Sequence, residues 1–201
     1  MTTDAGGAGV QLRVFLADDH AIVRSGIRGY LELTGDLTLA GEAASAQEAL
    51  DRLAALEPAG MLPDVVLMDL VMPGMDGIEA TRQIKKRWPG VEVVAVTSFA
   101  DQAKVISALQ AGAAGYVLKD ADVDRVAAAV RAAAAGQCHL DPAVARLLAD
   151  SLRGPRPAAD ALTYIMMRLH DGMGQTYQRM SNFVIDVDAT GRPYTPMSTP
   201  S

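Results

Sequence analysis

Hydrophobic positions along the chain follow two alternating patterns, one typical of buried strands and one typical of helices. Five short, almost unbroken apolar runs predict strands over residues 12–17, 37–43, 65–68, 91–98 and 115–119. After each run, apolar residues recur every three or four positions, which predicts a helix with one buried face. These helices are predicted over residues 20–33, 45–56, 78–88, 101–111 and 122–135.

This strand–helix alternation predicts an α/β fold built on a doubly wound parallel sheet. Strands that are apolar throughout need helices on both faces of the sheet, and right-handed crossovers leave few possible topologies. Five such units fit the flavodoxin-like strand order 2-1-3-4-5, in which ligands bind at the carboxyl ends of the strands.

A further helix is predicted over residues 142–152, because Pro142 suits a first helical turn. The Pro- and Gly-containing stretch 153–160 that follows has the composition of a linker. We therefore expect three segments, which are an α/β domain over 10–136, a helix and linker over 137–161, and a short irregular tail over 162–201.

Composition narrows the functional class. The net charge of -6 argues against a chain built mainly to neutralise nucleic-acid phosphates. The single cysteine, Cys138, cannot form an internal disulfide and is a poor metal site by itself. The N-terminus has no signal-peptide pattern, and no apolar stretch approaches the ~20 residues that span a bilayer. We expect a soluble, cytoplasmic protein without a membrane segment.

Chemically active side chains are predicted at the carboxyl ends of four strands. The third strand ends on a lone carboxylate, Asp69, although an ionised carboxylate is costly to bury. The first strand delivers Asp18 and Asp19, the fourth Thr97, and the fifth Lys119. Three acids in one place repel one another, and Mg²⁺, which prefers oxygen ligands, resolves that repulsion. Such a site suits an incoming phosphoryl group, with Asp69 as the nucleophile.

Four stretches carry a resemblance to a known family. "LADDHAIVRSGI", "VVLMDLVMPGMDGIEATRQIK", "VVAVTS" and "GAAGYVLKDA" resemble the receiver domain of NarL/LuxR (FixJ-type) response regulators. The resemblance covers residues 12–135 almost without a break. It implies a two-component protein that takes a phosphoryl group from a sensor histidine kinase and is not itself a turnover enzyme.

The resemblance also implies a role for each site residue. Asp69 would accept the phosphoryl group, while Asp19 and Asp69 would bind Mg²⁺ directly together with the Val71 carbonyl oxygen. Asp18 would act largely through water. Thr97 and Lys119 would contact the phosphoryl group.

Two further consequences concern switching and lifetime. Tyr116 stands at the aromatic position that would turn inward with Thr97 on phosphorylation, altering dimerisation or partner binding. The apolar side chain of Val71 cannot orient a hydrolytic water, which predicts a long-lived phosphoryl group. The family suggests a homodimer face on the first and fifth helices, which the sequence does not show.

Some residues allow a second interpretation. His20 follows the two acids directly and could bind a metal, but we favour a structural role for it. An aspartyl phosphatase is a third functional hypothesis, although such enzymes carry Asp-x-Asp after the first strand, whereas Asp18 and Asp19 are adjacent here.

The C-terminal segment departs from the family pattern. NarL/LuxR regulators continue into a helix-turn-helix DNA-binding domain, and "ALT" at 161–163 matches only its first letters. No basic recognition helix is visible after it, and residues 154–201 carry four Arg and four Asp. The family makes a DNA-binding transcriptional regulator of this lineage our alternative hypothesis. The missing basic recognition helix argues against DNA binding.

Overall fold

The protein is described by a computed structural model that covers residues 11–98 and 101–153. The predicted tail over 162–201, the linker over 154–161 and any DNA-binding segment lie outside these described residues. The elements in chain order are β1 (Leu12–Ala17), α1 (Ala21–Leu31), β2 (Leu37–Ala43), α2 (Ala46–Leu56), a short 3₁₀ turn (Glu57–Ala59), β3 (Val65–Asp69), α3 (Gly77–Arg87), β4 (Glu92–Thr97), α4 (Gln102–Gln110), β5 (Gly115–Leu118), α5 (Val123–Ala134), β6 (His139–Leu140) and α6 (Pro142–Arg153).

All strands of the sheet are parallel, in the order β2-β1-β3-β4-β5-β6. The predicted flavodoxin-like order of the first five strands is confirmed. The sixth strand was not predicted, because β6 has two residues and no apolar run to mark it. It pairs His139 with Gly115 and Leu140 with Tyr116, so it extends the sheet beyond β5.

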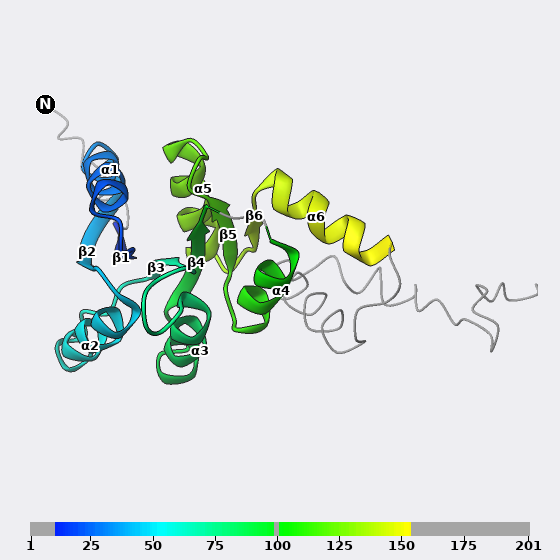
Figure 1. Cartoon of the computed structure of the whole chain (residues 1–201). Coiled ribbons are helices and arrows are strands. Elements are labelled where there is room, and N and C mark those ends of the chain that lie inside the picture. The colour runs from blue at the N-terminus through cyan, green and yellow to red at the C-terminus, as the bar shows by residue number, and fades with distance from the viewer. Residues whose placement is uncertain (1–10, 99–100, 154–201) are drawn as a thin grey trace, which may run out of the picture.

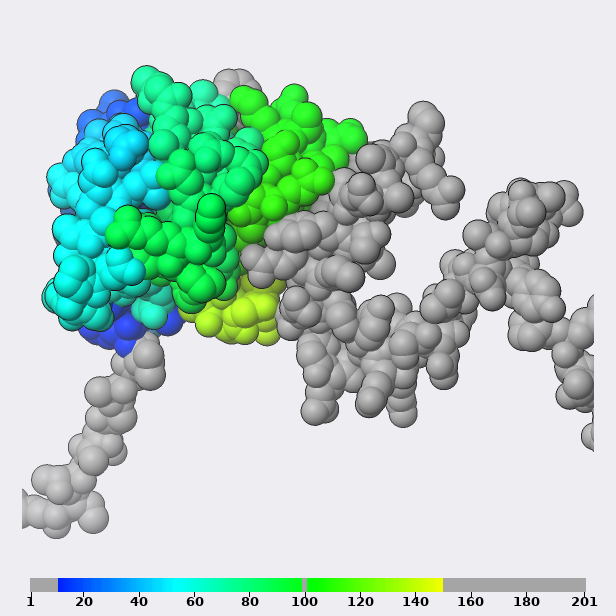
Figure 2. Space-filling model, turned by 90° about the horizontal axis from the view of Figure 1, so that it is seen from below, coloured from blue at the N-terminus to red at the C-terminus, as the bar shows by residue number. Residues whose placement is uncertain are grey.

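Helices cover both faces of the sheet, as Figure 1 shows. The alternation of side chains along a strand divides the core: Val14 and Leu16 of β1 pack in a cluster with α1 and α5. Phe15 and Ala17 pack in a second cluster with α2 and α3. Seen from below in Figure 2, α2, α3 and α4 lie next to one another on that second face. Each fully buried Val or Leu contributes about 1.5–3 kcal/mol to folding.

The helix boundaries follow local side-chain chemistry. Ser45, Asp76 and Asp101 each accept a hydrogen bond from the backbone N–H three residues on, at 3.2, 2.7 and 3.0 Å. These caps satisfy N–H groups that have no partner inside the helix. Gly112 and Gly136 follow α4 and α5 with φ of 104° and 72°, a backbone conformation that favours glycine.

β6 and α6 are anchored to the edge of the domain by Asp141. Its backbone N–H donates to the Tyr116 carbonyl oxygen at 3.0 Å. Its buried carboxylate accepts from the Ala143 N–H at 2.9 Å and from Arg125 Nη1 of α5 at 3.2 Å. Val144 of α6 is buried in a third cluster, which includes Tyr116 and residues of α4. The added segment therefore covers the β5 edge of the sheet and packs against α4.

Within residues 11–98 and 101–153, no helix is both long enough and apolar enough to cross a membrane.

Candidate functional site

The site lies where four neighbouring parallel strands end on the same side of the sheet. Asp69 is the last residue of β3, and Thr97 is the last residue of β4. Asp18 and Asp19 directly follow β1, and Lys119 directly follows β5. Because β1, β3, β4 and β5 are adjacent in the sheet, their carboxyl ends bring these side chains into one region, as predicted.

Lys119 joins two of the acids. Its ammonium lies 2.7 Å from Asp18 Oδ2 and 2.6 Å from Asp69 Oδ2. The carboxylates are almost fully buried, with 1% and 2% of each residue exposed, and the lysine side chain is 11% exposed. Buried charges are tolerated when they are paired. The ammonium is therefore the counter-charge that allows two carboxylates to share this space.

Burial and pairing compete at these groups. Burial raises the pKa of Asp69, and the hydrogen bonds from Lys119 and from the Val71 N–H only partly offset that rise. The negative charge of Asp18 raises the same pKa further. Burial lowers the pKa of Lys119, but its hydrogen bonds to Asp18 and Asp69 outweigh burial and leave that pKa above its ordinary value. An additional cation at the cluster would favour the ionised form of Asp69.

The loop after β3 holds the Asp69 carboxylate in place. The Val71 N–H donates to Asp69 Oδ1 at 3.0 Å, and the Gly77 N–H donates to the Leu70 carbonyl oxygen at 3.2 Å. The second bond closes the loop so tightly that a Cβ on Gly77 would lie 1.9 Å from the Asp69 carbonyl oxygen. Only glycine fits this close backbone approach. The helix cap at Asp76 is thus followed by a glycine that the loop under Asp69 requires.

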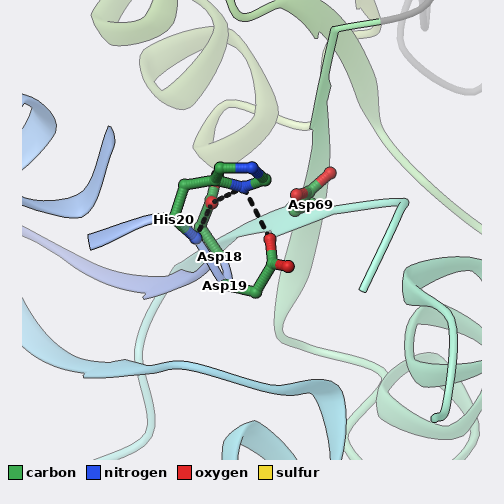
Figure 3. A group of neighbouring side chains, drawn as sticks. All are labelled: Asp18, Asp19, His20 and Asp69. Atoms are coloured by element: carbon green, nitrogen blue, oxygen red, sulfur yellow. Dashed lines mark hydrogen bonds and ion pairs between the residues drawn. The ribbon is translucent and has the colours of Figure 1, made fainter. Parts of the chain in front are cut away.

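Three carboxylates and one imidazole form a group that could hold a metal ion. Asp18, Asp19, His20 and Asp69 each offer one ligand atom, and these atoms all lie within 4.8 Å of one another. Figure 3 shows the side chains gathered at the ends of their strands. Opposite ligands of one Mg²⁺ are roughly 4.2 Å apart, from bond lengths of about 2.1 Å, so the group is close to the required size.

The donor set fits a hard divalent cation. Asp19 Oδ1 is a buried oxygen with no hydrogen-bond partner, and such atoms are costly unless something satisfies them. A cation beside this oxygen would satisfy it and would relieve the repulsion between the acids.

Thr97 brings an unsatisfied hydroxyl to the same strand ends. The residue is fully buried, and its Oγ1 has no hydrogen-bond partner. Its carbonyl oxygen accepts a hydrogen bond from the Lys119 backbone N–H at 2.9 Å, so these two residues are fixed next to each other. A buried hydroxyl without a partner is expected where a ligand supplies the partner.

Tyr116 lies apart from the acids, in the cluster formed with α4 and α6. It is fully buried. Burial raises its pKa to about 12, and the charges of Asp101 and Asp69 add to that rise. The structure therefore shows this side chain buried, and its part in a switch stays a prediction.

His20, for which the sequence favours a structural role, lies beside the acids. Its imidazole Nδ1 is 2.6 Å from Asp19 Oδ1 and 3.4 Å from Asp18 Oδ1. The only available signal was its position directly after the two acids. Val71 provides its backbone N–H to Asp69, while the residue is 41% exposed and its apolar side chain makes no polar contribution.

Comparison with known proteins identifies the family. The sequence model of the response regulator receiver domain matches residues 14–131. The chain belongs to this family. The curated VraR response regulator protein of Staphylococcus aureus is 44% identical over 108 residues, which are 54% of this chain and 49% of VraR. The chain thus spans about half the length of the curated relatives it matches.

Solved structures agree with the family and with the NarL/LuxR branch. A LuxR-family two-component response regulator from Aurantimonas sp. SI85-9A1 is 33% identical, with a TM-score of 0.65, over 72% of this chain and 99% of that one. The signal receiver domain of the putative response regulator NarL from Mycobacterium tuberculosis is 34% identical, with a TM-score of 0.57, over 64% and 99%. This receiver is therefore similar to LuxR- and NarL-type response regulators of two-component systems.

Proposed function

We propose that this receiver is a phosphorylation switch whose phosphoacceptor is Asp69. The observation that carries the proposal is the arrangement around this carboxylate. A buried ammonium lies 2.6 Å from Asp69 Oδ2, and a fully buried hydroxyl without a partner belongs to the neighbouring strand at Thr97. Both are groups that bind phosphoryl oxygens.

The proposed reaction transfers a phosphoryl group from a phosphohistidine to Asp69. An Asp69 carboxylate oxygen forms a bond to phosphorus as the bond between phosphorus and the imidazole nitrogen breaks, and the departing imidazole keeps the electron pair and takes up a proton. The product is an acyl phosphate. Lys119 neutralises charge on the phosphoryl oxygens, and the Thr97 hydroxyl donates a hydrogen bond to one of them.

The proposed metal is Mg²⁺, held by Asp19 and Asp69 with the Val71 carbonyl oxygen, and by Asp18 largely through water. When bound, Mg²⁺ would supply the positive charge that lets a phosphoryl group approach a carboxylate. Lys119 alone provides one positive charge against the three acids, which is why a second cation is part of the proposal.

The donor is proposed to be a sensor histidine kinase, because two-component response regulators pair with such kinases. We place this exchange in the cytoplasm and propose that it alters homodimer formation or the binding of a partner. Residues 10–136 form the phosphoacceptor unit in this proposal, and 137–161 lead out of it. The exposed apolar side chain of Val71 cannot position water for hydrolysis, so the phosphoryl group is expected to last much longer than seconds.

The test is phosphorylation by acetyl phosphate with MgCl₂, followed by intact mass. The wild-type protein is expected to gain the mass of one phosphoryl group, and the gain should disappear when EDTA replaces MgCl₂. Asp69→Asn should gain nothing. Asp120→Asn is the matched control, because Asp120 is an exposed acid directly after Lys119, and it should be labelled like the wild type. Labelling of Asp69→Asn to the wild-type extent would contradict the proposal.

Sizing before and after phosphorylation tests the output. A change in oligomeric state in the wild type that is missing in Asp69→Asn would support a dimerisation switch. An unchanged size, together with complete labelling, would leave the phosphoacceptor intact and reject dimerisation as its output.

A further inference from the structure

His20 occupies an unusual place beside the acids. It is the residue before the first turn of α1, and its extended backbone (φ -87°, ψ 107°) directs its N–H to Asp18 Oδ1 at 2.8 Å. That bond fixes the residue over the acid cluster. In Figure 3 one ring nitrogen faces the carboxylates of Asp18 and Asp19, while the other nitrogen points away from them. The side chain is 64% exposed, so neighbouring side chains do not force this orientation.

The ring of His20 lies close to Asp19. Nδ1 lies 2.6 Å from Asp19 Oδ1, yet this buried oxygen has no hydrogen-bond partner. Both residues also belong to the group whose ligand atoms all lie within 4.8 Å of one another, so the imidazole and this carboxylate are close enough to bind the same metal ion.

We propose that His20 Nδ1 is a ligand of the divalent ion in this site, and that the site therefore prefers Mn²⁺ to Mg²⁺. The inference rests on the proposed function, since it concerns the same ion. It adds a nitrogen donor to the carboxylates of Asp19 and Asp69, and it assigns the selectivity of the site to one residue.

The selectivity follows from the chemistry of the donors. Mg²⁺ is a hard ion that takes oxygen ligands and keeps several waters. Imidazole suits first-row transition metals, whose affinity for nitrogen donors exceeds that of Mg²⁺. A site with only carboxylate, carbonyl and water ligands gains little from exchanging Mg²⁺ for Mn²⁺. A site with one imidazole at bonding distance gains the metal–nitrogen bond with the transition metal.

The alternative is that His20 only pairs electrostatically with the acids. In that case neither Mg²⁺ nor Mn²⁺ would form a bond to the imidazole, whether or not the ion pair persists when the metal binds. The two possibilities differ in a direct observable, because only a coordinated imidazole transfers spin density from Mn²⁺ to its nitrogen atoms.

The experiment measures metal binding by the full chain without any phosphoryl donor. Mn²⁺ affinity is read from the electron paramagnetic resonance signal of free Mn²⁺, and Mg²⁺ affinity from competition. Electron spin echo modulation of bound Mn²⁺ detects imidazole nitrogen. The wild type should show nitrogen modulation. His20→Asn, which offers an oxygen donor of similar size, should lose the modulation and roughly tenfold or more in Mn²⁺ affinity, with a smaller change for Mg²⁺.

His139→Asn is the matched control, because His139 lies on β6 at the far edge of the sheet from β1. It should keep the wild-type modulation and both affinities. Nitrogen modulation that persists in His20→Asn, or an unchanged preference between the two ions, would overturn the His20 assignment alone. Failure of the wild type to bind either ion, or binding unaffected by Asp69→Asn, would instead reject the metal site of the proposed function.

Discussion

Replacing Gly77 by alanine should damage both the fold and the site, and the structure gives the size of the effect. The new Cβ would lie 1.9 Å from the Asp69 carbonyl oxygen, and 2.8 Å from both the Asp69 carbonyl carbon and Leu70 Cα. Close carbon–oxygen contacts are roughly 3.3 Å or longer, so the chain must move by about 1.4 Å. All three contacting atoms belong to the backbone and cannot rotate away.

Overpacking of this kind costs about 3 kcal/mol of folding free energy. In urea unfolding followed by circular dichroism, with a slope of about 2 kcal/mol/M, the midpoint should fall by about 1.5 M. The displaced atoms include the backbone of the phosphoacceptor itself. A misplacement of about 1 Å can cost roughly a hundredfold in rate, so labelling by acetyl phosphate should slow by a similar factor.

Alanine variants of two other glycines are controls for the general effect of adding a methyl group. Gly90→Ala meets open space at an ordinary backbone angle, and stability should change by less than about 0.5 kcal/mol. Gly74→Ala also meets open space but has φ of 80°, which should cost about 1–2 kcal/mol. If Gly77→Ala unfolded at the same urea concentration as Gly90→Ala, the argument that backbone contact at Gly77 positions Asp69 would be wrong.

Three further predictions concern charges of the site and of α6. The folded-state pKa of Asp69 is raised, so ionisation of this carboxyl group destabilises the folded protein at pH 7. Asp69→Asn should therefore be more stable than the wild type at pH 7 and should lose this advantage as the pH falls. Urea titrations at several pH values would check the sign. Lys119→Met leaves the buried carboxylates of Asp18 and Asp69 without their shared cation, which should lower the free energy of unfolding by about 3 kcal/mol. Added MgCl₂ should restore part of that loss in a thermal melt. A melt unchanged by MgCl₂ would argue against a cation site. Arg125→Ala removes the side chain of α5 that donates a hydrogen bond to Asp141, the buried residue before α6. Amide hydrogen exchange should become faster in α6, while β1 and β3 keep their protection. Equal protection of α6 in both proteins would show that this ion pair does not anchor the helix.

The sequence predicts the site well because strand periodicity and parallel topology together determine where side chains meet. Asp69 and Lys119 are 50 residues apart, yet each ends an apolar run, and adjacent parallel strands place those ends together. β6 could not be predicted, because two residues make no periodic pattern and the strand exists only through pairing with β5. The position of His20 depends on an Asp18 turn whose geometry is not encoded in residue type alone.

The added edge strand has a consequence for how this receiver should be divided. A protein shortened at residue 136, the boundary that periodicity suggests, would lose the partner strand of Gly115 and Tyr116. It would also uncover apolar side chains of α4 such as Val105, which are now buried in the cluster with α6. An unpaired strand edge beside an apolar patch promotes association between copies. Dimers of so short a fragment would form through the surface exposed by the truncation. A fragment that ends at residue 153 keeps β6 and α6, which cover that edge.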